Sequence, residues 1–238
     1  MVTVSFDQAH GGRWTSLRAG GREWLWRRPS PDRFAVRPGD PFVDAGGLEE
    51  CIPTVRGVPD HGAAWSRPWT SAGVDCGDFR LSRTWDEDTA TYRLEAEPGY
   101  RFVWAAHALL DLSPSAVLKA PAGTSARIDG GAVAAWPTPL AQLGPDDGTA
   151  VGAILVDCPA VTVADGERLT FSLEAPGQPV SVALWRNLGG WPPESPYRSI
   201  GVEPMLGRVF DLADAGPGDA AVVPPSGVCE WRLRVSAA

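Results

Sequence analysis

The sequence has little basic charge, and almost all of it is arginine. Lysine and arginine together number 21 against 29 aspartates and glutamates, which gives a formal net charge of −8 at neutral pH. Lys119 is the only lysine. A protein that binds the phosphate backbone of nucleic acids needs a basic excess. The composition therefore predicts that nucleic acid is not a partner.

Long apolar runs are also missing. No stretch approaches the roughly 20 apolar residues that cross a bilayer. Residues 1–12 carry Asp7 and His10, where a signal peptide would have a basic end followed by an apolar stretch. We therefore expect a cytoplasmic protein that does not bind membranes.

Cysteine is scarce and scattered. The four residues are Cys51, Cys76, Cys158 and Cys229, with no Cys-x-x-Cys pair and no histidine nearby at ligand spacing. This pattern argues against a zinc site. Because reducing compartments rarely hold disulfides, we expect buried free thiols.

Long helical windows are rare, because 27 glycines and 23 prolines interrupt the chain. The longest window without either, residues 78–97, ends in strict alternation of apolar and polar residues from Ala90 onward, as a strand with one solvated face requires. The same period of two recurs at 168–174 and 230–236. Shorter β-type segments lie at 2–6, 14–17, 23–26, 102–112, 117–119, 150–156, 160–163 and 180–185.

Strands at this spacing predict an all-β fold, a large antiparallel β-sandwich or a barrel. No change of composition, internal repeat or low-complexity tract divides the chain, so residues 1–238 are expected to form one domain. Residues 29–72 differ from the rest. They are rich in proline and glycine and poor in alternation, and such long irregular segments are usually functional.

Two of the three histidines are candidates for chemistry. His107 lies inside a β-type run, on the face that also carries Val103 and Ala105, where the alternative is a neutral core histidine bonded to a backbone carbonyl. His61 stands in the irregular segment, where a loop histidine without a role is the alternative. His10 lies in a glycine-flanked turn, and we interpret it as a surface residue.

Glu203 is a charged residue within an otherwise apolar β-type segment, and Pro204 keeps it out of the helical conformation. One interpretation is a carboxylate on an edge strand that faces water, because proline is tolerated mainly at strand edges. The other is a partly shielded carboxylate whose pKa is raised towards neutrality, where a general base works best.

The sequence lacks the glycine-rich phosphate-binding loops of nucleotide enzymes and the Gly-x-Ser-x-Gly elbow of serine hydrolases. It has 11 tryptophans, which is many for 238 residues. Most indoles pack in cores, but indole faces beside carboxylates and histidines also form sugar sites. Carbohydrate is therefore a candidate ligand.

Four segments resemble the aldose 1-epimerases, or galactose mutarotases, in their order and spacing over residues 1–207. They are Gly11-Gly-Arg-Trp-Thr-Ser-Leu with Gly21-Arg-Glu-Trp-Leu-Trp, Gly46-Gly-Leu-Glu-Glu-Cys-Ile-Pro-Thr, His61-Gly-Ala-Ala-Trp, and Ile200-Gly-Val-Glu-Pro-Met. The resemblance implies a large antiparallel β-sandwich with a sugar cleft across one concave sheet. It implies no cofactor and no metal.

The resemblance also implies roles in the interconversion of α and β anomers. Glu203 matches the general base for the anomeric hydroxyl, His107 matches the general acid for the ring oxygen, and His61 matches the histidine that helps to hold that oxygen. Ring opening removes one proton and adds another at opposite ends of a hemiacetal, which suits a glutamate and a histidine.

Three further residues are expected to contact the sugar: Trp65, Glu50 and Arg67. Arg67 leaves a phosphosugar open as the substrate, although the arginine that hexose-6-phosphate relatives place directly after the His-Gly motif is missing. Two different functions also remain open for the same architecture, a sugar-binding protein without catalysis and a lyase or hydrolase.

Overall fold

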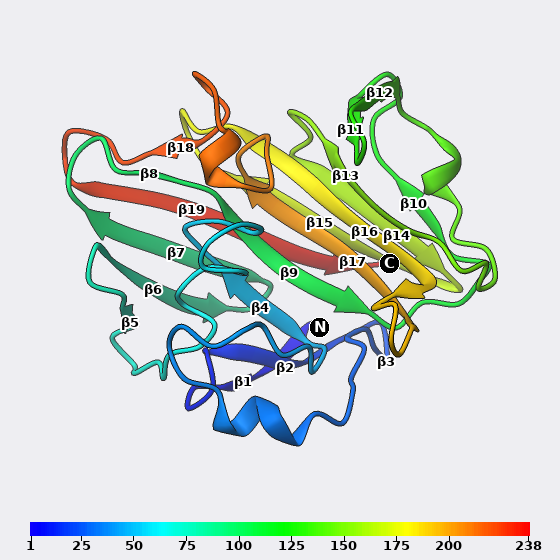
Figure 1. The fold of residues 1–238 in the computed structure, drawn as a ribbon, viewed down its shortest axis with the longest axis horizontal. Coiled ribbons are helices and arrows are strands. Elements are labelled where there is room, and N and C mark those ends of the chain that lie inside the picture. The colour runs from blue at the N-terminus through cyan, green and yellow to red at the C-terminus, as the bar shows by residue number, and fades with distance from the viewer.

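Two antiparallel sheets contain nearly all the regular structure of the computed structural model, which describes all 238 residues (Figure 1). The larger sheet has ten strands in the order β1-β2-β4-β9-β17-β16-β13-β11-β12, with β3 paired to β2. Its strands are β1 (Thr3–Asp7), β2 (Arg13–Ala19), β3 (Arg22–Glu23), β4 (Leu48–Cys51), β9 (Trp104–Leu110), β11 (Ser125–Ile128), β12 (Ala132–Ala135), β13 (Ala150–Leu155), β16 (Val180–Trp191) and β17 (Tyr197–Leu206).

The smaller sheet has seven strands in the order β10-β14-β15-β19-β7-β6-β5. Its strands are β5 (Val74–Asp75), β6 (Phe79–Asp86), β7 (Thr89–Ala96), β10 (Val117–Lys119), β14 (Ala160–Asp165), β15 (Glu167–Glu174) and β19 (Val228–Ala237). A separate pair joins β8 (Arg101–Phe102) to β18 (Ala221–Val222).

Helical structure is confined to three short 3-10 segments, η1 (Pro31–Ala35), η2 (Pro139–Ala141) and η3 (Leu212–Asp214). None is long and apolar enough to cross a membrane. The predicted all-β sandwich is confirmed. The window at 78–97 is a hairpin of β6 and β7, and the segment at 102–112 is two strands, β8 and β9. The hairpin of β11 and β12 is not among the predicted strands, and the irregular segment at 29–72 contains one short strand, β4.

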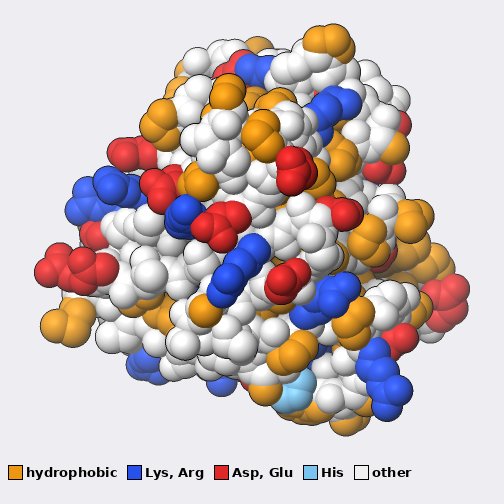
Figure 2. Space-filling model, turned by 90° about the vertical axis from the view of Figure 1, so that its left-hand side faces the viewer, with side chains coloured by type: hydrophobic (Ala, Val, Ile, Leu, Met, Phe, Trp, Pro, Cys, Tyr) orange, Lys and Arg blue, Asp and Glu red, His pale blue; other side chains and the backbone are white.

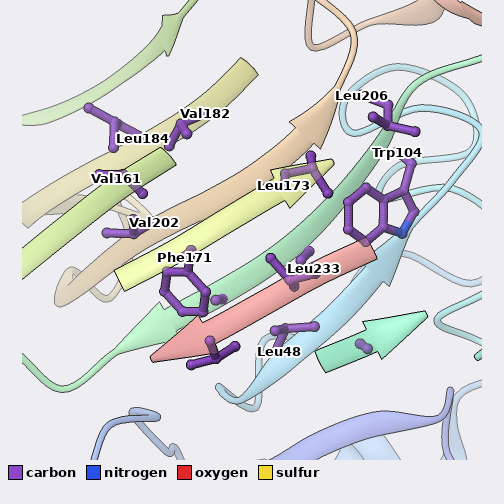
Figure 3. Close-up of a cluster of buried hydrophobic side chains, with 14 of the residues drawn as sticks. Leu48, Trp104, Val161, Phe171, Leu173, Val182, Leu184, Val202, Leu206 and Leu233 are labelled. Carbon is purple, nitrogen blue, oxygen red and sulfur yellow. The ribbon is translucent and has the colours of Figure 1, made fainter. Parts of the chain in front are cut away.

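The main core lies between the two sheets, and 48 buried residues form it. Figure 3 shows side chains from both layers pointing towards one another, among them Leu48, Trp104 and Leu206 from the larger sheet and Phe171 and Leu233 from the smaller. A second cluster of seven buried residues, including Ala105, Ala183 and Met205, lies on the opposite face of the larger sheet. Both faces of the central strands are therefore covered, which explains why every residue of β9 is buried.

The surface has no single-sign field on the side shown in Figure 2, where acidic, basic and apolar side chains are interspersed. The four cysteines are free thiols, as predicted; three are buried and Cys76 is partly exposed. The face of the larger sheet that points away from the main core and carries the smaller cluster is called the free face below.

Glu50 belongs to the core between the sheets. Its carboxylate is fully buried and accepts hydrogen bonds from Trp14 Nε1 at 3.3 Å, Trp104 Nε1 at 2.9 Å and Tyr92 Oη at 2.9 Å, and it pairs with Arg83. The expectation that Glu50 contacts a sugar in the cleft is therefore corrected. The residue lies on the same face of β4 as Leu48, and it joins the two sheets.

We predict that Glu50→Gln lowers the free energy of unfolding by about 3–5 kcal/mol, because it leaves the guanidinium of Arg83 buried without its counter-charge. Urea unfolding measures the change. Glu230→Gln is the matched control, since Glu230 is an exposed glutamate of β19, and its effect should stay within about 0.5 kcal/mol. Equal stability of the two variants would contradict this account of Glu50.

Candidate functional site

The pairing of three strands places three ionisable side chains in one line across the larger sheet. Glu49 of β4 lies directly opposite His107 of β9. The register of β9 with β17 pairs Leu109 with Gly201 and Ala105 with Met205, which brings His107 level with Glu203. Directly opposed residues present their side chains on the same face. Glu49, His107 and Glu203, here called the charged row, therefore all lie on the face away from the main core.

Glu203 lies on an internal strand, because β17 runs between β9 and β16. The interpretation of Glu203 as an edge-strand carboxylate facing water is therefore wrong. Pro204 is tolerated here because the β9–β17 ladder is interrupted between Gly201 and Met205, where proline has no N–H to donate. The Glu203 residue is only 3% exposed.

The carboxylate of Glu203 has an acid–base partner but receives no hydrogen bond from the protein. Its Oε1 lies 3.8 Å from His107 Nε2. Gly201 leaves the space that this carboxylate occupies, since a Cβ there would lie 2.3 Å from Oε1. Burial raises the pKa of Glu203 above its ordinary value of 4.5, while His107 and Arg56 oppose that shift. A buried carboxylate that accepts nothing from the protein is free to accept a proton from a ligand.

His107 is 8% exposed, and no backbone carbonyl accepts a hydrogen bond from its ring. The core-histidine alternative, which required such a bond, therefore does not describe it. The prediction that His107 shares a face with Val103 and Ala105 is confirmed, since both belong to the smaller cluster on the face away from the main core. The His107 ring faces Glu203 on that side.

His61 reaches the same place from a loop. Its backbone is left-handed, with a φ of 58°, and the next residue, Gly62, passes so close to Ile52, directly after β4, that a Cβ would lie 2.1 Å from the Ile52 carbonyl oxygen. This close approach explains why glycine follows the histidine. The ring stacks on Phe42 at 3.6 Å between centroids and meets His107 edge to face at 5.0 Å.

The environment of His61 favours its neutral form. Burial lowers the pKa of His61 below its ordinary 6.5, and the nearby His107 adds to this, whereas Asp60 opposes it from 3.0 Å. The two histidines therefore differ: His107 faces a carboxylate across the sheet, and His61 is a partly exposed ring that is mainly neutral at neutral pH.

The third member of the charged row, Glu49, is held by arginines. Arg33 Nε donates to Oε1 at 3.0 Å and Nη2 to Oε2 at 3.1 Å, and Arg13 lies 3.9 Å away. Burial raises the pKa of Glu49 to about 7 despite these cations. Arg33 also donates to the carbonyl oxygens of His10 and Trp65, so this one buried guanidinium ties β4 to the loop that carries His61.

A cleft of about 920 Å³ opens over His107 and Glu203, whereas Glu49 is not among its lining residues. Five carboxylates and two arginines are among its lining residues, together with both histidines and five aromatic side chains. The charged and aromatic lining comprises Asp32, Asp44, Asp60, Asp129, Glu203, Arg28, Arg56, His61, His107, Phe42, Trp185, Trp191, Tyr197 and Phe210. Arg56 is paired with Asp129 through two hydrogen bonds of 2.9 and 3.1 Å. The cleft therefore carries an acidic balance.

The structure brings three of the six predicted site residues together in the cleft: Glu203, His107 and His61. The expectation that the other three contact the sugar is corrected. Trp65 is 1% exposed and packs edge to face against Phe42 from behind, and Glu50 is in the main core. Arg67 lines a separate shallow pocket beside Arg80.

Sequence reasoning missed Glu49, Arg33 and the cleft aromatics. Glu49 and Glu50 are adjacent, and all four residues of β4 are buried, so no alternation shows which glutamate lies on the face away from the main core. For Trp185, the signal is its glycine neighbours: Gly152 and Gly201 flank it on both adjoining strands. This pairing depends on the register of three strands, which the linear sequence does not show.

Comparison with solved structures shows that the chain has the galactose mutarotase-like fold. The Slr1438 protein from Synechocystis sp. PCC 6803 aligns with a TM-score of 0.70 at 16% identity, over 99% of this chain and 92% of that chain. A candidate aldose 1-epimerase from Escherichia coli K12 aligns with a TM-score of 0.64 at 16% identity, over 99% and 96%.

A galactose mutarotase-like protein from Lactobacillus casei ATCC 334 aligns with a TM-score of 0.61 at 14% identity, over 100% of this chain and 97% of that chain. No protein-family model matches the sequence, and no curated protein matches it either. At these identities the likeness establishes the fold, and the activity has to be argued from the cleft itself.

We predict that Glu203→Gln stabilises the protein at pH 7. The folded state holds the Glu203 proton more tightly than the unfolded chain does, so the wild type loses stability as pH rises from about 4.3 through the raised pKa. The gain in the free energy of unfolding should be about 0.5–2 kcal/mol at pH 7, and it should vanish below about pH 4.

Urea unfolding of both proteins at a series of pH values checks this prediction. Glu174→Gln, at an exposed position of β15, is the control and should change little at any pH. A Glu203→Gln variant less stable than the wild type at pH 7 would show that the carboxylate is satisfied in the fold.

Proposed function

We propose that the protein is an aldose 1-epimerase-type enzyme that interconverts the α and β anomers of a free aldose. The observation that carries the proposal is the pair of Glu203 and His107. A buried carboxylate without any protein hydrogen bond faces an imidazole nitrogen 3.8 Å away, at the floor of a cleft. The fold that this chain shares with galactose mutarotase-like proteins supports the same function.

The geometry suits ring opening of a hemiacetal. Glu203 takes the proton from the anomeric hydroxyl, the bond between C1 and the ring oxygen breaks, and protonated His107 gives its Nε2 proton to that oxygen. The free aldehyde rotates about C1–C2. The alcohol then attacks the other face of the carbonyl and returns its proton to His107, while the new anomeric oxygen accepts the Glu203 proton. Both groups are restored, and the protons balance.

His61 has a different part in this proposal. Because burial lowers its pKa, its ring is neutral at neutral pH and can hydrogen-bond the ring oxygen without adding a second positive charge beside His107. Its stacking on Phe42 fixes the plane of the ring. We therefore assign proton donation to His107 and orientation of the substrate to His61.

The charge of the cleft favours an unphosphorylated sugar. Five carboxylates line it against two arginines, and Arg56 is already paired with Asp129. Arg67, which kept a phosphosugar open at the level of the sequence, lies outside the cleft. The negatively charged lining would repel a phosphate dianion, whereas sugar hydroxyls can donate hydrogen bonds to these carboxylates.

The direct test is mutarotation of freshly dissolved glucose and galactose, followed by polarimetry. The wild type should accelerate it, and Glu203→Gln should lose about 10²–10⁴-fold in kcat, because an amide cannot accept the proton. Glu174→Gln should keep full activity. If the wild type binds these sugars by calorimetry yet accelerates neither, the protein is a carbohydrate-binding protein on this fold and the enzymatic proposal is wrong.

The pH dependence of kcat/KM tests the base independently. Glu203 must be ionised to act, so activity should fall as pH is lowered through its raised pKa, with a midpoint above 4.5. The positive charge of Arg56 opposes that shift, so Arg56→Met should move the midpoint to higher pH. A midpoint at or below 4.5, or one that Arg56→Met leaves unchanged, would remove Glu203 from the base role.

A further inference from the structure

A second pocket, of about 430 Å³, shares no lining residue with the cleft. Most of its lining comes from residues 67–75, which lead into β5, and from Arg80 of β6 beside them. These two strands lie at one edge of the smaller sheet (Figure 1). Apart from two prolines, no apolar side chain lines the pocket. Its volume is within the roughly 300–1,000 Å³ of small-molecule sites, and its lining suits a polar ligand.

Arg67 lines this pocket and makes no hydrogen bond or ion pair with the protein. Its Nε is hidden from solvent and has no partner. Three other arginines also hide an unpartnered nitrogen, but each of them donates to a backbone carbonyl through another nitrogen. They are Arg13, Arg186 and Arg198. Polar groups that are removed from solvent normally have hydrogen-bond partners. The guanidinium of Arg67 is therefore available to a ligand.

The backbone around Arg67 is held in place by the rest of the fold. Its carbonyl oxygen accepts a hydrogen bond from the Gly11 N–H at 3.1 Å. Two residues later, the Trp69 N–H donates to the carbonyl oxygen of Gln8 at 2.7 Å, and the Trp69 side chain packs in the main core. Arg67 thus extends from a fixed segment, which lowers the entropic cost of binding a ligand.

Arg80 contributes the second guanidinium of the pocket. Its Nη2 donates to the carbonyl oxygen of Ala72 at 3.2 Å, and the side chain is exposed. Ala72 lies in a tight turn, because Thr70 and Gly73 exchange backbone hydrogen bonds of 3.0 Å in both directions. This contact holds the Arg80 guanidinium beside the turn that forms one wall of the pocket.

Asp75 is the one acidic residue of the lining, and it stands opposite Arg80 in the pairing of β5 with β6. No ion pair joins the two, and Asp75 Oδ1 instead accepts from the Gly77 N–H at 2.8 Å. Two arginines against one aspartate leave the pocket with a net positive charge, although the chain as a whole carries −8. The pocket therefore attracts anions, in contrast to the acidic cleft.

We propose that this pocket binds a phosphate group, as inorganic phosphate or as a phosphate monoester, between Arg67 and Arg80. Each guanidinium can pair with two oxygens of an anion through parallel N–H donors. A carboxylate has only two oxygens and satisfies one such fork, whereas a phosphate offers at least three acceptor oxygens and up to two negative charges. The site lies outside the cleft and does not depend on the sugar chemistry proposed for Glu203 and His107.

The test is calorimetric titration of the whole chain with inorganic phosphate and with glycerol 3-phosphate, in chloride buffer at constant ionic strength. At least one compound should bind saturably, with a Kd of about 1 mM or below. Arg67→Met and Arg80→Met should each weaken that binding at least about ten-fold, because each removes charge-assisted hydrogen bonds. Arg232→Met, at an exposed position of β19, changes the net charge equally and should leave the affinity unchanged.

Arg80 is exposed, so Arg80→Met tests the site even if the replacement of the partly buried Arg67 disturbs the fold. Tighter binding of glycerol 3-phosphate than of inorganic phosphate supports the site with a phosphate monoester as its ligand. Equal or weaker binding supports it with inorganic phosphate. No saturable binding of either compound would overturn the proposal, and so would binding that Arg80→Met weakens no more than Arg232→Met does. The measurement does not involve mutarotation, so its result is independent of the anomerase proposal.

Discussion

The register of β4, β9 and β17 is the constraint on which the site depends. It sets Glu49, His107 and Glu203 in one line on the free face of the larger sheet. A shift of one residue in any of these strands would turn its member of the line into the main core. The apolar residues of the opposite face, such as Trp104 and Leu206, fix the register through packing against the smaller sheet (Figure 3). Packing in the main core thereby positions the three side chains of the charged row.

The two carboxylates of the charged row are treated in opposite ways. Glu49 is compensated by Arg33 and Arg13, and the same Arg33 fastens the loop of His61 through the Trp65 carbonyl. Glu203 forms no ion pair with an arginine and accepts no hydrogen bond from the protein, and its nearest charged partner is His107 at 3.8 Å. The ion pairs of Glu49 therefore stabilise the site, whereas the carboxylate of Glu203 remains available to a ligand. Active sites commonly contain a functional group, like Glu203, whose lack of protein partners lowers the stability of the fold.

Much of the fold could be predicted from the sequence because alternation survives wherever one face of a strand is solvated, as in β7, β15 and β19. The central strands β9 and β17 are buried on both faces, so alternation is weak there. The motif around Glu203, with His107 between it and the His-Gly motif, supplies what periodicity does not. The hairpin of β11 and β12 has small, exposed residues that carry little signal.

The substrate-contact residues are harder to predict. The sequence pattern predicts Glu50 as a sugar contact, yet donors between 33 and 54 positions away along the chain satisfy Glu50 inside the core. No local pattern reveals partners at that distance. Trp65 is predicted at the sugar, but it supports Phe42 from behind. Trp185 lies opposite glycines on two other strands, and this pairing is a property of the sheet and not of the segment.

The most direct test of the central claim is a crystal structure of Glu203→Gln with a reducing sugar bound. The account predicts that the anomeric hydroxyl contacts the side chain at position 203 and that the ring oxygen lies within about 3.2 Å of His107 Nε2. His61 should then face the same ring. A sugar bound elsewhere, or one in the cleft with its anomeric carbon turned away from both Glu203 and His107, would contradict the assignment of the site.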